Sequence, residues 1–265
     1  MFSVIQCQFM QNAIIGAFLA GIACGIIGTY VVVKRIVFIA GGISHAAFGG
    51  IGLGYFLNLN PILTSLPFTS VLATMMGIIV EKSDVSEDVV IGILWAVGMA
   101  IGILFVNLTP GYVSGLFTYL FGNILMISKS DLILMTILDT IILTTVFLFN
   151  KEFTAISFDE EYAEALGVPT TIFYLFLLNL VAISIIMIIK AMGIILTIAL
   201  LTIPAAIGKK YTSRIESMMK IAAFIAIISS LIGLELSYLL NLSSGATIVL
   251  VLAILFIITH ITKEK

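Results

Sequence analysis

The feature that most constrains this chain is a series of long apolar runs separated by only a few polar residues each. A helix of roughly 20 residues crosses the hydrocarbon core of a bilayer. Backbone groups in lipid must bond internally, and these runs lack the alternation of barrel strands. The sequence therefore predicts an all-α, polytopic transmembrane helical bundle of eight or nine spans, near residues 9–33, 36–57, 62–80, 89–107, 131–149, 170–189, 191–207, 216–236 and 245–260.

Composition excludes a separate soluble domain. Hydrophobic residues make up 61% of the chain and charged residues 10%, whereas a soluble domain carries about 25% charged residues. Residues 1–265 are thus expected to form a single transmembrane domain in the lipid bilayer. The formal net charge of -2 gives no indication of a nucleic-acid partner. Cys7 and Cys24 match neither a metal motif nor a disulfide framework, and we interpret them as small apolar packing residues.

Basic residues predict the orientation, because cytoplasmic loops of membrane proteins are enriched in lysine and arginine. A path with the N-terminus outside and the C-terminus in the cytoplasm satisfies most of them, provided that residues 115–128 (GLFTYLFGNILMIS) form an interfacial or re-entrant helix. Lys129 and Lys190 are the two exceptions. The residues placed in the cytoplasm are Lys34, Arg35, Lys82, Lys151, Lys209, Lys210, Arg214, Lys263 and Lys265.

Small residues recur every four positions in the first two spans. Such stripes let helix backbones approach closely, so we predict tight packing of both helices. Glycine-rich helices near a substrate path also permit rocking or a break, and both interpretations stay open. The stripes comprise Ala17, Gly21 and Gly25, then Gly42, Ala46, Gly50 and Gly54.

The longest hydrophilic stretch, residues 150–170, predicts a short helix. Acidic residues crowd its start, where the helix dipole favours them, and Gly167 ends it. Its apolar positions lie three or four apart and form one face. A solvated loop is the plain alternative, but an apolar face beside charges favours docking into a groove of another protein. The apolar positions are Phe158, Tyr162, Ala165 and Leu166, and the acidic positions Asp159, Glu160, Glu161 and Glu164.

His45 lies within the second span, and an ionisable side chain at membrane depth is a functional-site hypothesis. Neutral imidazole is a common transition-metal ligand, although a hydrogen bond to a nearby carbonyl explains His45 equally well. One histidine is not a metal site. Candidate metal-binding partners in other spans are Asp139 and Glu235. Hydrogen bonds from neighbouring threonine hydroxyls explain Asp139 as well, and contact with the outer membrane interface explains Glu235 as well.

Enzyme chemistry finds no support in the sequence. Ser44 and His45 are adjacent and point about 100° apart on a helix, which does not suit a nucleophile and its base. HExxH, GxSxG and GxxxxGKS/T motifs are absent. We therefore expect no catalytic role and no cofactor bound by this chain, with any nucleotide bound by another chain.

Several segments together resemble the metal-ion permease family of ATP-binding-cassette (ABC) importers, which import zinc, manganese or iron. Each segment alone is a weak signal, but they appear in the family's order over most of the chain. They are residues 21–57 (including GGISHAAFGG), 119–128 (YLFGNILMIS), 157–169 (SFDEEYAEALGVP) with 192–206 (MGIILTIALLTIPAA), and 236–250 (LSYLLNLSSGATIVL).

The resemblance implies a homodimer in the cytoplasmic membrane of a prokaryote. Each copy of the family's permeases docks one cytoplasmic ATPase, and an extracytoplasmic binding protein delivers the divalent metal. Residues 157–167 look like the family's coupling helix, which contacts the ATPase. SHA at residues 44–46 matches the pathway motif, with His45 at the metal-contacting histidine.

One departure concerns the metal. Family members usually carry an aspartate one helical turn before the histidine, where this chain has Gly41. Either a ligand comes from elsewhere, with Asp139 and Glu235 as candidates, or a different ion or a complexed metal is carried. A permease for a siderophore or cobalamin chelate and a secondary cation carrier remain the alternatives; the former are usually longer, and the latter needs more titratable groups in the membrane.

Overall fold

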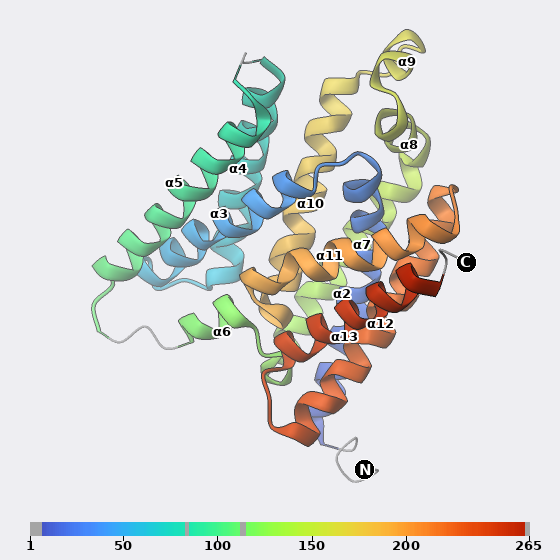
Figure 1. The fold of residues 1–265 in the computed structure, drawn as a ribbon. Helices are drawn as coiled ribbons and strands as arrows, with labels where there is room; N and C mark the ends of the chain where they lie inside the picture. Colours follow the sequence, from blue (N-terminus) through green and yellow to red (C-terminus); the bar gives the residue numbers. More distant parts are fainter. Residues whose placement is uncertain (1–6, 83–84, 112–114, 263–265) are drawn as a thin grey trace.

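The computed structural model describes residues 7–82, 85–111 and 115–262, and within these ranges every regular element is a helix (Figure 1). The elements are α2 (Gln8–Val33), α3 (Val37–Phe56), α4 (Pro61–Lys82), α5 (Glu87–Leu108), α6 (Leu116–Phe121), η1 (Ile124–Met126), α7 (Lys129–Leu148), α8 (Asn150–Phe158), α9 (Glu160–Ala165), α10 (Thr170–Met192), α11 (Ile194–Tyr211), α12 (Ile215–Leu240) and α13 (Ser244–Thr262).

Eight helices of the described residues are long and apolar enough to cross a membrane: α2, α3, α4, α5, α7, α10, α12 and α13. The predicted all-α transmembrane bundle is therefore confirmed. The one remaining predicted span, residues 191–207, is also helical and corresponds to α11, which is not among these eight. Residues 115–128 form only the six-residue α6 and the three-residue η1, which are too short to cross.

Two central helices organise the bundle. α3 packs mainly against α4 and α5, whereas α2 packs mainly against α12 and α11. α10 contacts both central helices as well as α4. In Figure 1, α4 and α5 therefore lie on one side of α10, and α12 and α13 lie on the other. Outward-facing apolar side chains such as Phe147 and Leu104 remain exposed, as a lipid-facing surface requires.

The predicted close approach of glycine-bearing helices is confirmed. A Cβ atom at Gly25 of α2 would overlap the backbone of Ala223 on α12, and one at Gly28 would overlap the carbonyl of Leu201 on α11. On α3, a Cβ at Gly50 would lie 2.6 Å from the Cα of Ser65. Backbone-to-backbone contact at these crossings therefore depends on the absence of a side chain.

A pair of glycines joins residues 115–128 to the break between α10 and α11. Gly122 and Gly193 have φ angles of 74° and 78°, in a region that favours glycine. A Cβ on either one would overlap the backbone of the other. The short segment is thereby packed against the α10–α11 junction rather than passing through the bundle.

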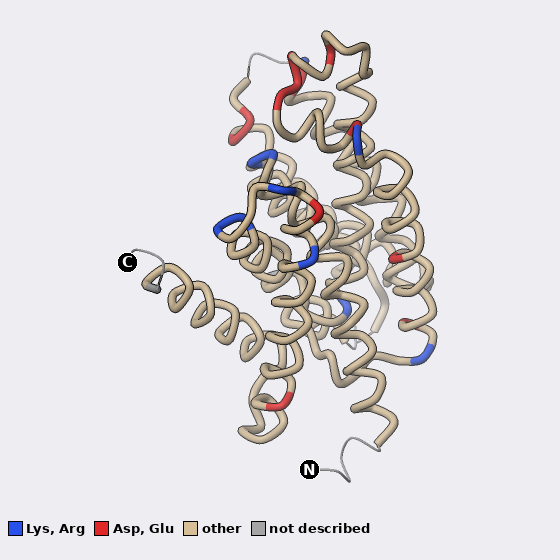
Figure 2. Tube along the Cα trace, turned by 90° about the vertical axis from the view of Figure 1, so that its right-hand side faces the viewer, with Lys and Arg blue, Asp and Glu red and all other residues tan. Residues whose placement is uncertain are grey.

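Charged residues concentrate at the end of the bundle that holds α8 and α9 (Figure 2). Lys34, Arg35 and Lys209 line one cleft at this end, and Lys34 and Glu81 line a second. Lys210 also donates a hydrogen bond to the last turn of α13. The loops around Lys34, Arg35 and Lys209, which the basic residues assigned to the same side of the membrane, therefore lie at the same end of the bundle.

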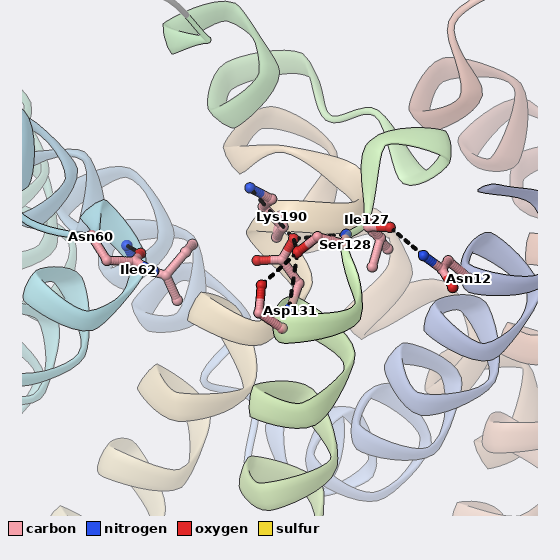
Figure 3. Close-up of polar contacts among 8 residues, drawn as sticks. Asn12, Asn60, Ile62, Ile127, Ser128, Asp131 and Lys190 are labelled. Atoms are coloured by element: carbon pink, nitrogen blue, oxygen red, sulfur yellow. Dashed lines mark hydrogen bonds and ion pairs between the residues drawn. The ribbon is translucent and has the colours of Figure 1, made fainter. Parts of the chain in front are cut away.

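The opposite end contains the two lysines that were exceptions, and one of them has local partners (Figure 3). Lys190 lies 3.7 Å from the carboxylate of Asp131 and 5.3 Å from the ring centre of Tyr119. Asp131 accepts hydrogen bonds from the backbone and hydroxyl of Ser128 at 2.9 and 2.7 Å. Burial raises the pKa of Tyr119 to about 12, so its ring faces the lysine as a neutral phenol.

The α2–α12 crossing provides a test of packing. We expect Gly25→Leu to lower the free energy of unfolding by roughly 1–3 kcal/mol, because the new side chain forces two backbones apart. Gly92→Leu is the matched control, since a Cβ at Gly92 meets nothing within 4 Å. Thermal unfolding in detergent measures both. Equal behaviour of the two variants would contradict the close crossing.

Candidate functional site

The α8–α9 segment, residues 157–167, is built by local capping. α8 ends at Phe158, and Asp159 adopts an extended conformation. The Asp159 carboxylate accepts a 2.9 Å hydrogen bond from the backbone N–H of Tyr162 and caps α9. Gly167 ends the segment with a φ of 83°. The predicted single short helix is therefore two helices with a corner at Asp159.

Three large apolar side chains project from this corner. Phe158 is 62% exposed, Tyr162 62% and Leu166 63%. Ala165, Glu161 and Gly167 are exposed as well, whereas Ala163 is buried and anchors α9. This end of the bundle is charged, so the three apolar side chains lie among polar groups, whereas the lipid-facing apolar residues lie among other apolar residues. The segment therefore presents exposed apolar side chains on a charged surface.

Two clefts of opposite charge lie beside the segment. The cleft next to α9 has a volume of about 400 Å³ and is lined by five glutamates: Glu81, Glu87, Glu160, Glu161 and Glu164. The cleft next to the end of α8 has a volume of about 460 Å³ and is lined by Lys34, Arg35 and Lys209 with three hydroxyl-bearing side chains. Lys34 lines both clefts.

His45 lies on α3, half-buried, with its ring stacked on that of Trp95 from α5. The ring centres are 4.1 Å apart and the planes differ by 13°. Sequence reasoning did not single out Trp95, although it is the chain's one tryptophan; the pairing depends on how α3 crosses α5. The neighbouring Ser44 hydroxyl donates to the carbonyl of Gly41 at 2.8 Å and is therefore not activated by His45.

Gly41 lies one turn before His45. A Cβ atom there would meet only the side chain of Ile198, at 3.2 Å. The backbone therefore does not exclude a side chain at this position. The absence of a carboxylate beside His45 is a property of the sequence rather than of the helix packing.

The two candidate carboxylates occupy other helices. Asp139 is buried in α7, 3% exposed, and neither of its carboxylate oxygens has a hydrogen-bond partner. Glu235 is exposed near the end of α12. Among the described residues, no group of three or more His, Cys, Asp or Glu side chains is arranged to hold a metal ion. One copy of the chain thus presents His45 with an aromatic partner and no cluster of metal ligands.

Known proteins resemble this chain both in sequence and in fold. A model of the ABC 3 transport family matches residues 6–263. The chain belongs to the ABC 3 transport family. It is 45% identical to the membrane protein slr2045 of Synechocystis over 98% of this chain and 92% of the relative. It is 32% identical to the manganese transport system membrane protein MntC of Listeria monocytogenes, over 99% of this chain and 93% of the relative.

A solved structure shares the fold of this ABC 3 family member. PsaBC from Streptococcus pneumoniae, in complex with Fab, matches with a TM-score of 0.88 and 29% identity. The match covers 97% of this chain and 93% of the other. The chain is therefore a multi-pass membrane protein with the architecture of an ABC transport permease.

Asp139 allows a test of whether its carboxyl group stabilises the fold. We expect Asp139→Ala to raise the free energy of unfolding by about 1 kcal/mol, because an unsatisfied buried polar group is removed. Asp131→Ala, the same substitution on the same helix, should lower it by about 1 kcal/mol, since Ser128 loses its partner. Thermal unfolding in detergent compares the two. A loss of stability in both variants would mean that Asp139 has a stabilising partner.

Proposed function

We propose that this chain is the membrane-spanning permease subunit of an ABC importer that carries a divalent metal ion, manganese, zinc or iron, across the cytoplasmic membrane of a prokaryote. Membership of the ABC 3 transport family supports the permease role. The similarity to a manganese transport system membrane protein in Listeria supports a metal cargo. The metal is the substrate and is not a resident cofactor.

The observation that carries the proposal is the exposure of Phe158, Tyr162 and Leu166 at the charged end of the bundle. We assign residues 157–167 as the coupling segment that docks an ATPase in the cytoplasm. An apolar knob with charged flanks suits a groove in another protein. The sequence has no nucleotide-binding loop, so ATP is hydrolysed by that separate subunit. Two copies of the permease would bring two ATPases together.

The orientation follows from the docking role. The end that holds α8 and α9 faces the cytoplasm, together with the loops near Lys34 and Lys209 and the C-terminus. The end near Lys190 faces the exterior, where an extracytoplasmic binding protein delivers the ion. This arrangement agrees with the enrichment of basic residues in cytoplasmic loops.

His45 marks the pathway in this proposal. Transition metals need several ligands, and the described residues of one copy contain no group of three or more His, Cys, Asp or Glu side chains that could hold one. The indole face of Trp95 lies against the imidazole. A homodimer would supply further groups from a second copy. Asp139 and Glu235 remain candidate pathway residues, although neither lies in a ligand group with His45 in one copy.

ATP-dependent closure of the paired ATPases would displace the coupling segments and move the central helices. Such a movement switches the pathway between outward-open and inward-open states. The chain's own contribution is mechanical and electrostatic, since it forms no covalent intermediate.

The docking role predicts the effect of a charge on the exposed knob. We expect Leu166→Asp to weaken co-purification of the ATPase at least about tenfold, a loss of roughly 1.4 kcal/mol, because an apolar contact is replaced by a charge. Leu242→Asp is the control and should leave binding unchanged, because Leu242 is also largely exposed, at 55%, but lies between α12 and α13 at the other end of the bundle. Retained binding in Leu166→Asp would rule out residues 157–167 as the docking site.

The pathway role predicts a transport defect without a docking defect. We expect His45→Ala to lower ATP-driven manganese uptake into proteoliposomes at least about tenfold, roughly 1.4 kcal/mol of lost stabilisation, with ATPase binding intact. His260→Ala, at the chain's other histidine on the last turn of α13, should transport normally. Normal uptake in His45→Ala would place the pathway elsewhere.

A further inference from the structure

The ammonium group of Lys34 joins three helices at the cytoplasmic end of the bundle. Lys34 follows the last residue of α2, and its side chain is only 10% exposed. Its Nζ atom donates to the carbonyl of Ile156 on α8 at 3.0 Å and to the carboxylate of Glu160 on α9 at 2.7 Å. It also lies 5.0 Å from the ring centre of Tyr174 on α10.

These partners span the corner of the α8–α9 segment. Ile156 lies in the last turn of α8, where carbonyl groups lack helical donors, and Glu160 is the first residue of α9. A cation is favourable at a helix C-terminus. A largely buried ammonium needs such partners, because an unpaired charge is costly to bury. Lys34 therefore holds the corner between α8 and α9 against the end of α2.

A second contact one turn earlier fixes α8 along α2. The Tyr30 hydroxyl donates to the side chain of Asn150, the first residue of α8, at 3.1 Å. Between the two contacts, the fully buried ring of Phe153 lies 5.8 Å from that of Tyr30. α8 is thus attached to α2 at its start, middle and end, so a displacement of α8 displaces the end of α2.

The turn after Lys34 carries this displacement into the helix that bears His45. Only Lys34, Arg35 and Ile36 separate α2 from α3. Arg35 has a φ of 64°, a strained value for a residue with a side chain. The N–H of Ile36 bonds back to the carbonyl of Val31 at 3.0 Å. Such a short, hydrogen-bonded turn restricts movement of α2 relative to α3.

We propose that Lys34 is the positioning residue that couples the docking segment to α3, and hence to the pathway at His45. The inference rests on the proposed function and adds to it the route by which ATPase movement reaches the transported ion. Loss of Lys34 should separate ATP hydrolysis from transport, because the ATPase still docks on Phe158, Tyr162 and Leu166, which Lys34 does not contact through any of its hydrogen bonds.

The test uses the intact complex of permease and ATPase in proteoliposomes, with manganese as the transported probe. Co-purification of the ATPase, the rate of ATP hydrolysis, and manganese ions imported per ATP hydrolysed are measured for each variant. The variants are Lys34→Gln, the conservative Lys34→Arg, Lys34→Glu, and the exchange Lys34→Glu with Glu160→Lys. Lys151→Gln, which removes an exposed charge from α8, is the control.

We expect Lys34→Gln to keep ATPase binding and ATP hydrolysis but to import about tenfold fewer ions per ATP, within the range of coupling between distant sites. Lys34→Arg and Lys151→Gln should behave as the unaltered chain. The exchange variant should recover the ion-pair part of what Lys34→Glu loses, because a carboxylate at position 34 can pair with a lysine at position 160 but cannot donate to the carbonyl of Ile156. A merely structural role would lower the yield of protein without changing the ratio of ions to ATP.

An unchanged ratio in Lys34→Gln, or an equal loss of docking and transport, would overturn the inference. If Lys34→Gln does not insert, the exchange variant decides, and its failure to improve on Lys34→Glu is equally negative. If the unaltered chain binds the ATPase and imports manganese, the proposed function stands whatever the variants do. Failure of the unaltered chain to bind an ATPase or to import manganese would overturn both.

Discussion

The absence of water from the bilayer core determines most of this structure. Backbone groups must bond within each segment, so every regular element among the described residues is a helix, and charges collect at the ends of the bundle. The same constraint concentrates polar chemistry in a few short connections. Residues 157–167 lie in the longest hydrophilic stretch of the sequence, and they combine glutamates with exposed aromatic and aliphatic side chains.

Close packing in lipid has a different origin from packing in water. Lipid tails are as apolar as the helices, so association relies on shape and on small residues at crossings. Gly25 and Gly50 let the central helices α2 and α3 touch their neighbours at backbone distance. In the proposed mechanism, the contacts of Tyr30 and Lys34 with α8 join the docking segment to this central pair.

The region around His45 is poor in charge. Its closest ring partner is the indole of Trp95, and Gly41 stands where a carboxylate would share the same helix face. Asp139 remains buried and unpaired on another helix. In the proposed pathway, a cation at this point would meet π-electron density and imidazole rather than a carboxylate cage. In the proposed homodimer, a second copy would supply additional ligands, since one copy contains no group of three or more candidate ligands among its described residues.

The sequence left open whether residues 115–128 cross the membrane. Hydropathy and glycine spacing were enough to predict the bundle and the close helix crossings, and the spacing of apolar residues predicted the apolar face of the α8–α9 segment. These features depend on local composition and on the solvent, which a sequence reports directly. The stacking of His45 on Trp95 and the contacts of Lys34 were decided only by tertiary structure. Each depends on how distant helices cross, and crossing angles arise from side-chain packing between segments that a linear pattern does not relate.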